Sequence, residues 1–299
     1  MLLLVALGFI QLLPVSGKDS NENASKKDDT DKGILTSNPF LDATHFWPLE
    51  VLRSGIFSMD FVTGHSAIVL QGGELVKDDK FQEVISTEKK GSYIIAGDFK
   101  ETCFSNPDSC IMGGMTISFW LKLNDTNINK TQDAYIISSG GQSKKSRGFA
   151  FLYFHGRYVA CLSTRRAQWK MYVPKIEPNI WNNIVFVWKK GETLSYYLNG
   201  SFVEETYSKP AYRPSVNYTI LTIGRPNNAI NVEFMYPLRM CALALWDRPL
   251  KKDQIEKAYD NIKKFHEQPD LKKKRRSKII KEFASKRRLN KIRRHVIHL

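Results

Sequence analysis

The feature that most constrains this chain is a series of short apolar runs, separated by turn signals, between about residues 42 and 259. The runs are rich in β-branched and aromatic residues, which fit the pleated surface of a sheet. Turn dipeptides fall between them, such as His155-Gly156 and Asn199-Gly200, where a tight hairpin needs residues that tolerate positive φ. The rhythm of about 8–12 residues predicts an all-β sandwich of two antiparallel sheets. The clearest runs are 117–123, 149–154, 158–162, 169–173, 184–188 and 194–198.

One of these runs indicates where the core lies. Residues 184–188 are apolar at every position, so both faces of that strand are predicted to be covered and the strand to be central in its sheet. Trp120 and Trp181 are expected to anchor the core between the two sheets, because an indole contributes a large buried area.

A helical pattern follows the last strand. Residues 253–265 place Ile255, Tyr259 and Ile262 on one helical face, and Pro269 prevents the helix from continuing. We therefore expect a short C-terminal helix.

The ends of the chain differ from its body. Residues 1–17 form an apolar run that is too short to span a bilayer comfortably and ends in small residues, which predicts a secretory signal peptide rather than an uncleaved anchor. No later segment is long and apolar enough to be expected to cross a membrane. Residues 18–40 are too polar to offset the cost of ordering, so we expect a flexible linker. The expected layout continues with a sandwich domain over 41–265 and a basic tail over 266–299.

Most of the net charge of +15 lies in that tail. Residues 270–299 hold 13 Lys and Arg against 2 Asp and Glu, a net charge of +11, which leaves +4 for the rest of the chain. Such a run is either a solvated tail, partly helical or disordered, or a segment that binds polyanions. For a secreted chain the polyanions are glycosaminoglycans and anionic cell surfaces rather than nucleic acid. The residues predicted to bind them are Lys272, Lys273, Lys274, Arg275, Arg276, Lys286, Arg287, Arg288, Arg293 and Arg294.

A second interpretation of the tail is proteolytic release. Lys274-Arg275-Arg276 precedes Ser277 and resembles a proprotein-convertase site, so the tail is alternatively a cationic peptide that is cut from a precursor.

Cysteines and sequons agree with secretion. Cys103 and Cys110 bracket a turn-rich segment and are expected to form a local disulfide. Cys161 and Cys241 are either a second, long-range disulfide, which we favour slightly, or two buried thiols on neighbouring strands. The Asn-X-Ser/Thr sequons predict glycosylation at Asn23, Asn124, Asn129, Asn199 and Asn217.

Several ordered motifs resemble the laminin-G-like family of concanavalin-type jelly-rolls over about residues 42–262. The segment 181–203 resembles the family's central signature of a Trp, a hydrophobic strand, a turn and Tyr-x-Asn-Gly, although Asn182 stands where the family often has His. The other similar segments are 113–123, 221–225 and 243–255. The resemblance implies a jelly-roll sandwich that binds glycans or proteins through rim loops. The candidate loops are 124–142 and 163–166.

The family also includes glycoside hydrolases and Ca²⁺-binding modules, so both roles need a test. Retaining hydrolysis requires two carboxylates about 5 Å apart, and no Glu-x-Asp-x-Glu strand provides them. Asp247, beside the expected helix start, is more simply a capping residue. The candidate Ca²⁺ ligands Asp60, Asp98 and Asp108 form no cluster with a ligand rhythm, so we expect no cofactor, with Ca²⁺ as the alternative.

The sequence thus favours a secreted, non-catalytic binding or adhesion protein of the extracellular matrix or cell surface. In this hypothesis the sandwich binds a glycan or a matrix protein, and the tail binds polyanions. A divergent glycan-processing enzyme is the last alternative.

Overall fold

The computed structural model describes residues 42–49, 52–53, 57–60, 62–63, 66–70, 72–124, 133–142, 146–174, 176–212, 218–227 and 236–267. The predicted signal peptide and linker, three of the predicted glycosylation sites and all ten basic residues of the tail lie outside these ranges. Those three sites are Asn23, Asn129 and Asn217.

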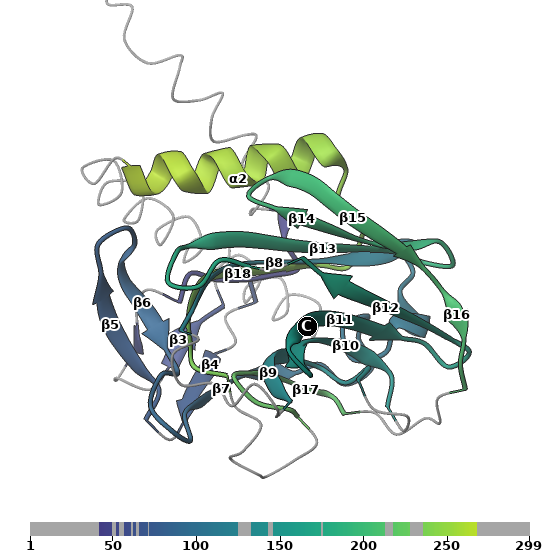
Figure 1. Cartoon of the computed structure of the whole chain (residues 1–299), viewed down its shortest axis with the longest axis horizontal. Coiled ribbons are helices and arrows are strands. Elements are labelled where there is room, and N and C mark those ends of the chain that lie inside the picture. Colours follow the sequence, from purple (N-terminus) through teal and green to yellow (C-terminus); the bar gives the residue numbers. More distant parts are fainter. Residues whose placement is uncertain are drawn as a thin grey trace, which may run out of the picture. The chain divides into compact units, whose positions relative to one another are not determined.

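The described residues form two antiparallel sheets that pack face to face, which confirms the predicted sandwich (Figure 1). The first, sheet A, has the order β15 (Ser201–Tyr207), β14 (Thr193–Leu198), β13 (Asn182–Lys189), β8 (Gly114–Leu123), β18 (Leu238–Trp246), β6 (Gln82–Ser86) and β5 (Glu74–Asp78), with β1 (His45–Trp47) paired to β18. The second, sheet B, has the order β16 (Lys209–Pro210), β12 (Ala167–Val173), β11 (Arg157–Ser163), β10 (Gly148–Phe154), β9 (Ala134–Ser138), β17 (Ile220–Ile223), β7 (Tyr93–Asp98), β4 (Ser66–Leu70), β3 (Phe57–Met59) and β2 (Leu52–Arg53).

The main hydrophobic core fills the space between the sheets. On β13, Ile184, Phe186 and Trp188 point into this core, and Phe149 and Phe151 of β10 meet them from sheet B. The ring centroids of Phe151 and Phe186 are 5.1 Å apart. Aromatic side chains supply the large contact area that a two-layer core requires.

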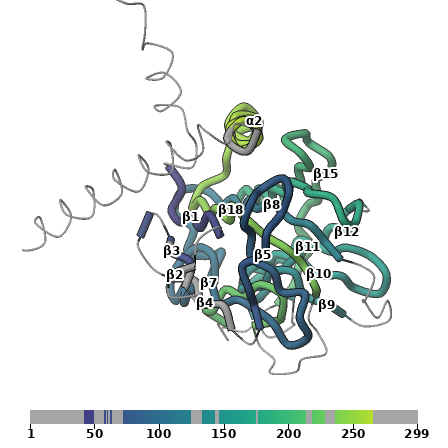
Figure 2. The backbone as a smooth tube through the Cα atoms, turned by 90° about the vertical axis from the view of Figure 1, so that its left-hand side faces the viewer, coloured from purple at the N-terminus to yellow at the C-terminus, as the bar shows by residue number. Residues whose placement is uncertain are grey.

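Sheet A is apolar on its outer face as well. Helix α2 (Lys252–Glu267) packs there, and Figure 1 shows it lying across β14, β13 and β8. Figure 2 shows the helix almost end-on, outside the sandwich. Ile255 and Ile262 are buried and Tyr259 stacks on Trp120 with ring centroids 5.6 Å apart, so the predicted helical face is confirmed. Because α2 covers Val185 and Val187, β13 is buried on both sides, as predicted for a central strand.

Two sequence-based expectations about this region are wrong in detail. Trp120 and Trp181 lie in the cluster beneath α2 and not in the core between the sheets. Asp247 does not cap the helix, which begins five residues later; the Gln254 side chain instead accepts a hydrogen bond from the backbone N–H of Lys251 at 2.9 Å. The sequence pattern indicates a cap residue before the helix and does not reveal that Gln254, in the first turn, takes this role.

The predicted turns are present. Asn199 and Gly200 join β14 to β15 with φ of 51° and 81°, and His155 and Gly156 join β10 to β11 with φ of 46° and 83°. Gly200 packs against the Tyr259 ring, so this hairpin also supports α2.

A pair of glycines at the start of β8 provides a test of the packing between β8 and β13. Both have positive φ, but a Cβ on Gly114 would lie 1.9 Å from the Trp188 carbonyl oxygen, whereas a Cβ on Gly113 would meet nothing within 4 Å. We predict that Gly114→Ala lowers the free energy of unfolding by about 3 kcal/mol or more, because the two strands must separate. Gly113→Ala should cost only about 1 kcal/mol of backbone strain. Urea unfolding followed by tryptophan fluorescence measures both, and equal losses would contradict the assignment.

Candidate functional site

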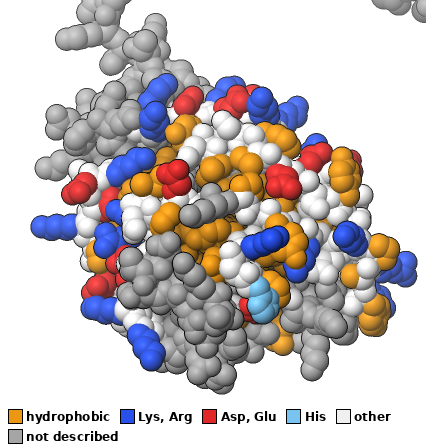
Figure 3. Space-filling model, viewed as in Figure 1, with side chains coloured by type: hydrophobic (Ala, Val, Ile, Leu, Met, Phe, Trp, Pro, Cys, Tyr) orange, Lys and Arg blue, Asp and Glu red, His pale blue; other side chains and the backbone are white. Residues whose placement is uncertain are grey.

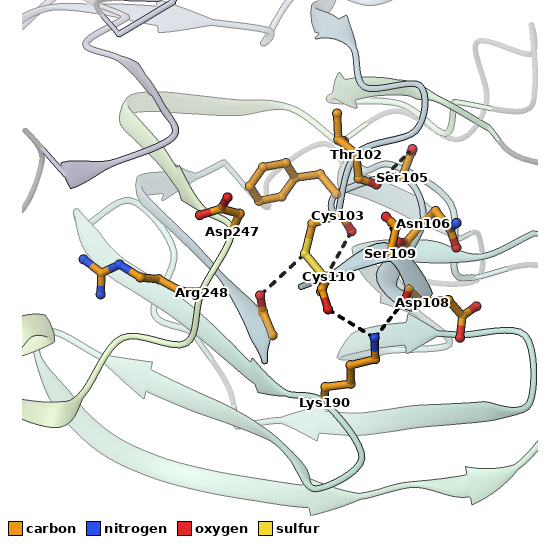
Figure 4. The surroundings of a disulfide bond; sticks show 12 residues. Thr102, Cys103, Ser105, Asn106, Asp108, Ser109, Cys110, Lys190, Asp247 and Arg248 are labelled. Atoms are coloured by element: carbon orange, nitrogen blue, oxygen red, sulfur yellow. Dashed lines mark hydrogen bonds between the residues drawn. A yellow bond between two sulfur atoms is a disulfide. The ribbon is translucent and has the colours of Figure 1, made fainter. Parts of the chain in front are cut away.

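The Cys103–Cys110 disulfide closes a loop that links β7 in sheet B to β8 in sheet A (Figure 4). This confirms the predicted local pair. The loop contains the short helix η2 (Pro107–Ser109), and its cysteines are buried. Because the loop joins both sheets, it fixes one rim of the sandwich.

Side chains and backbone groups from three other connections hold this loop. Nζ of Lys190 donates to the carbonyl oxygens of Asp108 and Cys110 at 2.8 and 3.1 Å (Figure 4). The Asp108 carboxylate accepts from the Arg147 guanidinium at 3.1 Å and from the backbone N–H of Arg165 at 2.8 Å. The rim loop is therefore pre-organised rather than tethered by the disulfide alone.

The second predicted disulfide is wrong. Cys161 lies on β11 of sheet B, among Ala150, Leu152 and Val159 on the side that faces away from the main core. Cys241 lies on β18 of sheet A, in the cluster beneath α2. Both are buried thiols, and they point in opposite directions from two different sheets, so no disulfide geometry is accessible to them.

The three candidate Ca²⁺ ligands are used by protein donors. Asp60 accepts hydrogen bonds from His45 Nδ1 at 2.8 Å, from the backbone N–H of Phe46 at 2.9 Å and from the Thr63 hydroxyl. The Asp98 carboxylate accepts from the N–H of Lys100 and is exposed, and Asp108 is held by Arg147 as described above. Within the described ranges no group of three or more His, Cys, Asp or Glu side chains is arranged to hold a metal ion.

Two predicted glycosylation sites are described. Asn199 is exposed at the hairpin tip, and its Oδ1 accepts a hydrogen bond from the backbone N–H of Asn183 at 2.9 Å. That bond leaves the amide nitrogen, the atom that carries an N-linked sugar, directed away from the ladder. Asn124 is half-buried, and its amide nitrogen lies 3.4 Å from a Glu88 carboxylate oxygen. The geometry of Asn199 is thus the more favourable for a glycan.

The outer face of sheet B holds a group of aromatic and basic side chains that we call the outer patch: Tyr135, Phe154, Arg157, Lys170 and Tyr172. They lie on β9 to β12, opposite the residues of the same strands that point into the main core. Nζ of Lys170 is 4.8 Å from the Phe154 ring centroid and 5.2 Å from that of Tyr172, and the Arg157 guanidinium is 5.6 Å from the Tyr172 ring. Tyr172 is half exposed (49%), so the patch reaches solvent.

Burial and charge define the electrostatics of the outer patch. Burial raises the pKa of Tyr135, and the neighbouring Asp133 and Cys161 raise it further, so the phenol stays neutral. Burial also raises the pKa of Asp133, and the nearby His155 and Lys170 partly offset this effect. Lys170 thus lies near a carboxyl whose charge is disfavoured, and Arg157 beside Tyr172 adds a second cation to the patch.

A row of polar side chains continues this face toward β17, and we call it the polar row: Ser138, Gln142, Ser163, Thr222 and Asn227. The Ser138 hydroxyl lies 3.3 Å from both the Gln142 and Asn227 side-chain oxygens, and Ser163 donates to the Gly141 carbonyl at 2.8 Å. Among the described residues, Nε2 of Gln142 is buried without a hydrogen-bond partner. It is one of several buried polar atoms in this state, and Ser138, Ser163 and Thr222 are fully buried, so the polar row lies inside the protein surface rather than on it.

Sequence reasoning found part of this surface. Tyr135, Ser138 and Gln142 fall in the candidate loop segment 124–142, and Ser163 begins the segment 163–166, although the first three lie on β9 or directly after it. It missed Lys170 and Tyr172. The signal was present in the alternation over 167–173, where Trp169, Met171 and Val173 point inward and the residues between them are exposed.

Two carboxylates that share one arginine do not favour acid catalysis. The Arg239 guanidinium lies 3.8 Å from Asp78 and 3.0 Å from Glu88. Burial alone would raise the pKa of Asp78, but hydrogen bonds from the Trp181 indole and from two backbone N–H groups, together with Lys122, hold it below its ordinary value. A proton donor for hydrolysis needs the opposite shift.

The exposed hydrophobic side chains are unevenly distributed, and on the face drawn in Figure 3 they gather toward the middle with charged groups mainly around them. No helix within the described residues is both long and apolar enough to span a membrane.

Two antiparallel sheets that pack over one core, with a rim loop joining them, define a lectin-like β-sandwich domain. The chain belongs to the concanavalin A-like lectin/glucanase superfamily, whose laminin G type model matches residues 97–256, more than half of the chain. This confirms the resemblance seen in the sequence.

Two curated relatives are adhesion receptors. The human Adhesion G-protein coupled receptor D1 is 27% identical over 223 residues, which cover 71% of this chain and 23% of the receptor. The bovine receptor of the same name is 26% identical and is covered to 25%. The chain thus spans about a quarter of the length of these relatives.

The similar solved structures share the fold at low identity. The botulinum neurotoxin serotype D ligand binding domain in complex with N-acetylneuraminic acid superposes with a TM-score of 0.54 at 14% identity, covering 76% of this chain and 52% of that one. The botulinum neurotoxin DC binding domain in complex with rat synaptotagmin II gives 0.54 at 13% identity, covering 74% and 51%. These likenesses establish the architecture alone.

The buried Asp60 provides a pH-dependent test of how the N-terminal strand is held. Although burial raises its pKa, the hydrogen bonds from His45, Thr63 and Phe46 outweigh burial, and the pKa of Asp60 lies below its ordinary value. A lowered carboxyl pKa stabilises the fold above the unfolded value of about 3.9, and this stability is lost as the pH falls through the folded value. We predict that the melting temperature of the wild type falls steeply below about pH 4, and that Asp60→Asn lowers it at pH 7 and flattens the acid limb. Asp98→Asn, at an exposed carboxylate, is the matched control and should change neither.

Proposed function

We propose that this protein is an extracellular, non-catalytic binding domain whose outer patch recognises an acidic carbohydrate. The single observation that carries the proposal is the position of Lys170 between the Phe154 and Tyr172 rings with Arg157 beside them. The arrangement combines positive charge with aromatic surface on a rigid sheet.

The geometry favours an acidic ligand over a neutral one. Neutral sugars bind aromatic rings by stacking on an open face, but here cations already lie over the Tyr172 and Phe154 rings. A carboxylate or sulfate pairs with Arg157 and Lys170 through charge-assisted hydrogen bonds. The hydroxyls of Ser138, Ser163 and Thr222 in the polar row are fully buried and bonded within the protein, so the exposed outer patch carries the recognition.

The relatives support a binding role and not a particular ligand. One similar structure was solved with N-acetylneuraminic acid, an acidic sugar, and the curated relatives are named as adhesion receptors. Their folds fix neither the site nor the ligand of this chain, since the same sandwich serves many functions.

Secretion and modification form the second part of the proposal. The N-terminal apolar run, the sequons and a disulfide in a small loop are each expected of a chain that passes through an oxidising compartment. Asn199 offers an exposed, pre-oriented acceptor for a glycan.

The tail has a separate proposed role. We propose that residues 266–299 bind glycosaminoglycans of the matrix or cell surface through their net positive charge. This part rests on the sequence alone.

The outer patch is tested on a glycan array with the full-length secreted protein. We predict that the double variant Arg157→Ala/Lys170→Ala binds sialylated or sulfated glycans about 10–100-fold more weakly, since two charge-assisted contacts are lost. Lys77→Ala/Lys263→Ala removes the same charge from exposed positions on β5 and α2 and should bind as the wild type does. Wild-type binding that prefers neutral glycans, or equal losses in both double variants, would reject the proposed site.

The tail is tested on a heparin column. We predict that truncation after Pro269 abolishes salt-sensitive retention, because about eleven net positive charges are removed, whereas the Arg157→Ala/Lys170→Ala variant is retained. Retention that survives truncation would overturn this role of the tail without touching the proposed glycan site.

A further inference from the structure

Two apolar side chains project into solvent directly after the rim disulfide. Ile111 is 90% exposed and Met112 is 57% exposed, and Ile111 is the most exposed of the large hydrophobic residues in the described ranges. The next residue, Gly113, has open space around its Cα on the side where a Cβ would stand. The two residues form a convex tip, which we call the apolar tip.

The surrounding structure prevents the apolar tip from folding inward. On its N-terminal side, Cys110 is fixed by the disulfide and by Lys190. On its C-terminal side, the Gly113 carbonyl accepts a hydrogen bond from the backbone N–H of Lys190 at 3.0 Å, and Gly114 enters the β8–β13 ladder opposite Lys189. With both ends pinned, the exposure of Ile111 is imposed by the fold and not by a loose loop.

Basic side chains flank the apolar tip on two neighbouring turns. Lys189 and Lys190 lie on the β13–β14 turn, and Arg165 and Arg166 lie on the β11–β12 turn, which contacts η2 through Asp108. The acidic groups on these turns and on η2 are Asp108, which is paired with Arg147, and the exposed Glu192. The two turns and η2 thus carry four cations against two carboxylates, one of which is already paired with Arg147, so the surroundings of the tip are positive.

We propose that the apolar tip inserts into the interface of an anionic phospholipid bilayer while the flanking lysines and arginines contact the lipid headgroups. An apolar group that enters the acyl boundary, surrounded by basic side chains at headgroup level, is the arrangement that stabilises a peripheral protein on a negatively charged leaflet. Two apolar side chains that project into solvent, with cations on the neighbouring turns, favour an anionic lipid surface over a protein pocket. This surface is separate from the outer patch and does not depend on its ligand.

A tryptophan placed at the tip reports insertion directly. The full-length Met112→Trp variant is mixed with vesicles of phosphatidylcholine and phosphatidylserine that carry bromine on their acyl chains. Because the native tryptophans are buried, the introduced indole is the one that bromine reaches. We expect its emission to be quenched and blue-shifted on vesicles that contain phosphatidylserine. Ile180→Trp, at a residue that is 46% exposed and follows Asn179, which bonds to Leu123 at the far end of β8, is the matched control and should stay unquenched.

The same experiment separates the tip from the basic tail. A tail that brings the protein to the vesicle without the tip leaves the Met112→Trp indole unquenched, and this result would overturn the proposal. Equal quenching of the control would also overturn the proposal. So would a protein partner whose binding Ile111→Ser abolishes, if the Met112→Trp indole remains unquenched on vesicles.

The energetic role of the tip is measured by vesicle sedimentation in moderate salt. We expect Ile111→Ser/Met112→Ser to weaken partition to phosphatidylserine vesicles at least about tenfold, because the apolar area transferred from water is lost. The substituted side chains are exposed, so folding is preserved, and the double variant should bind acidic glycans and heparin as the wild type does. Unchanged partition would reject the tip as an anchor while leaving the proposed glycan site intact.

Discussion

The structure depends on one constraint, which is that sheet A is apolar on both faces. Strands β8, β13 and β18 contribute side chains both to the core between the sheets and to the cluster beneath α2. A sheet of this kind must be covered twice, first by sheet B and then by a helix, since exposed apolar area of this size would drive association. Tyr259 of the helix stacks on Trp120, and the Asn199-Gly200 hairpin packs against Tyr259. A turn of the sandwich therefore helps to hold the helix that covers sheet A.

This double cover determines where function can reside. With the outer face of sheet A largely occupied by α2, the surfaces left for recognition within the described ranges are the outer face of sheet B and the rim. Each of these carries a signature of its own. The outer face of sheet B combines cations with rings, whereas the rim combines a disulfide-closed loop with an exposed Ile111. Rigid sheets position side chains more accurately than loops do, and the rim loop gains similar rigidity from Lys190 and Arg147.

The sequence predicted the architecture well because periodicity carries that information. The apolar run 184–188, the Asn199-Gly200 turn and the face of Ile255 and Ile262 each follow from local geometry, and the structure confirms them. The predictions that were wrong are those that depend on which sheet a strand joins. An even number of cysteines allows Cys161 to pair with Cys241, yet their strands belong to opposite sheets and their side chains point outward. Likewise, Trp120 and Trp181 were recognised as buried but assigned to the wrong layer. Cation–aromatic contacts between Lys170 and Phe154 cross from β12 to β10, and no pattern within one segment reveals them.

The placement of these surfaces limits how the proposed contacts combine. The helix α2 covers the outside of sheet A, and the outer patch lies on the outside of sheet B, so one flat surface does not touch both at once. The rim loop joins the two sheets and therefore lies at the side, where a membrane contact leaves both faces open to other ligands. The segment after α2 has 32 residues and spans roughly 100 Å when fully extended, which exceeds the thickness of the sandwich several-fold. In its proposed role, a basic segment of that reach raises the effective concentration of the sandwich near an anionic surface without fixing its orientation. Orientation must then come from the rigid elements, and this is the physical reason to assign specificity to the outer patch and the apolar tip rather than to the tail.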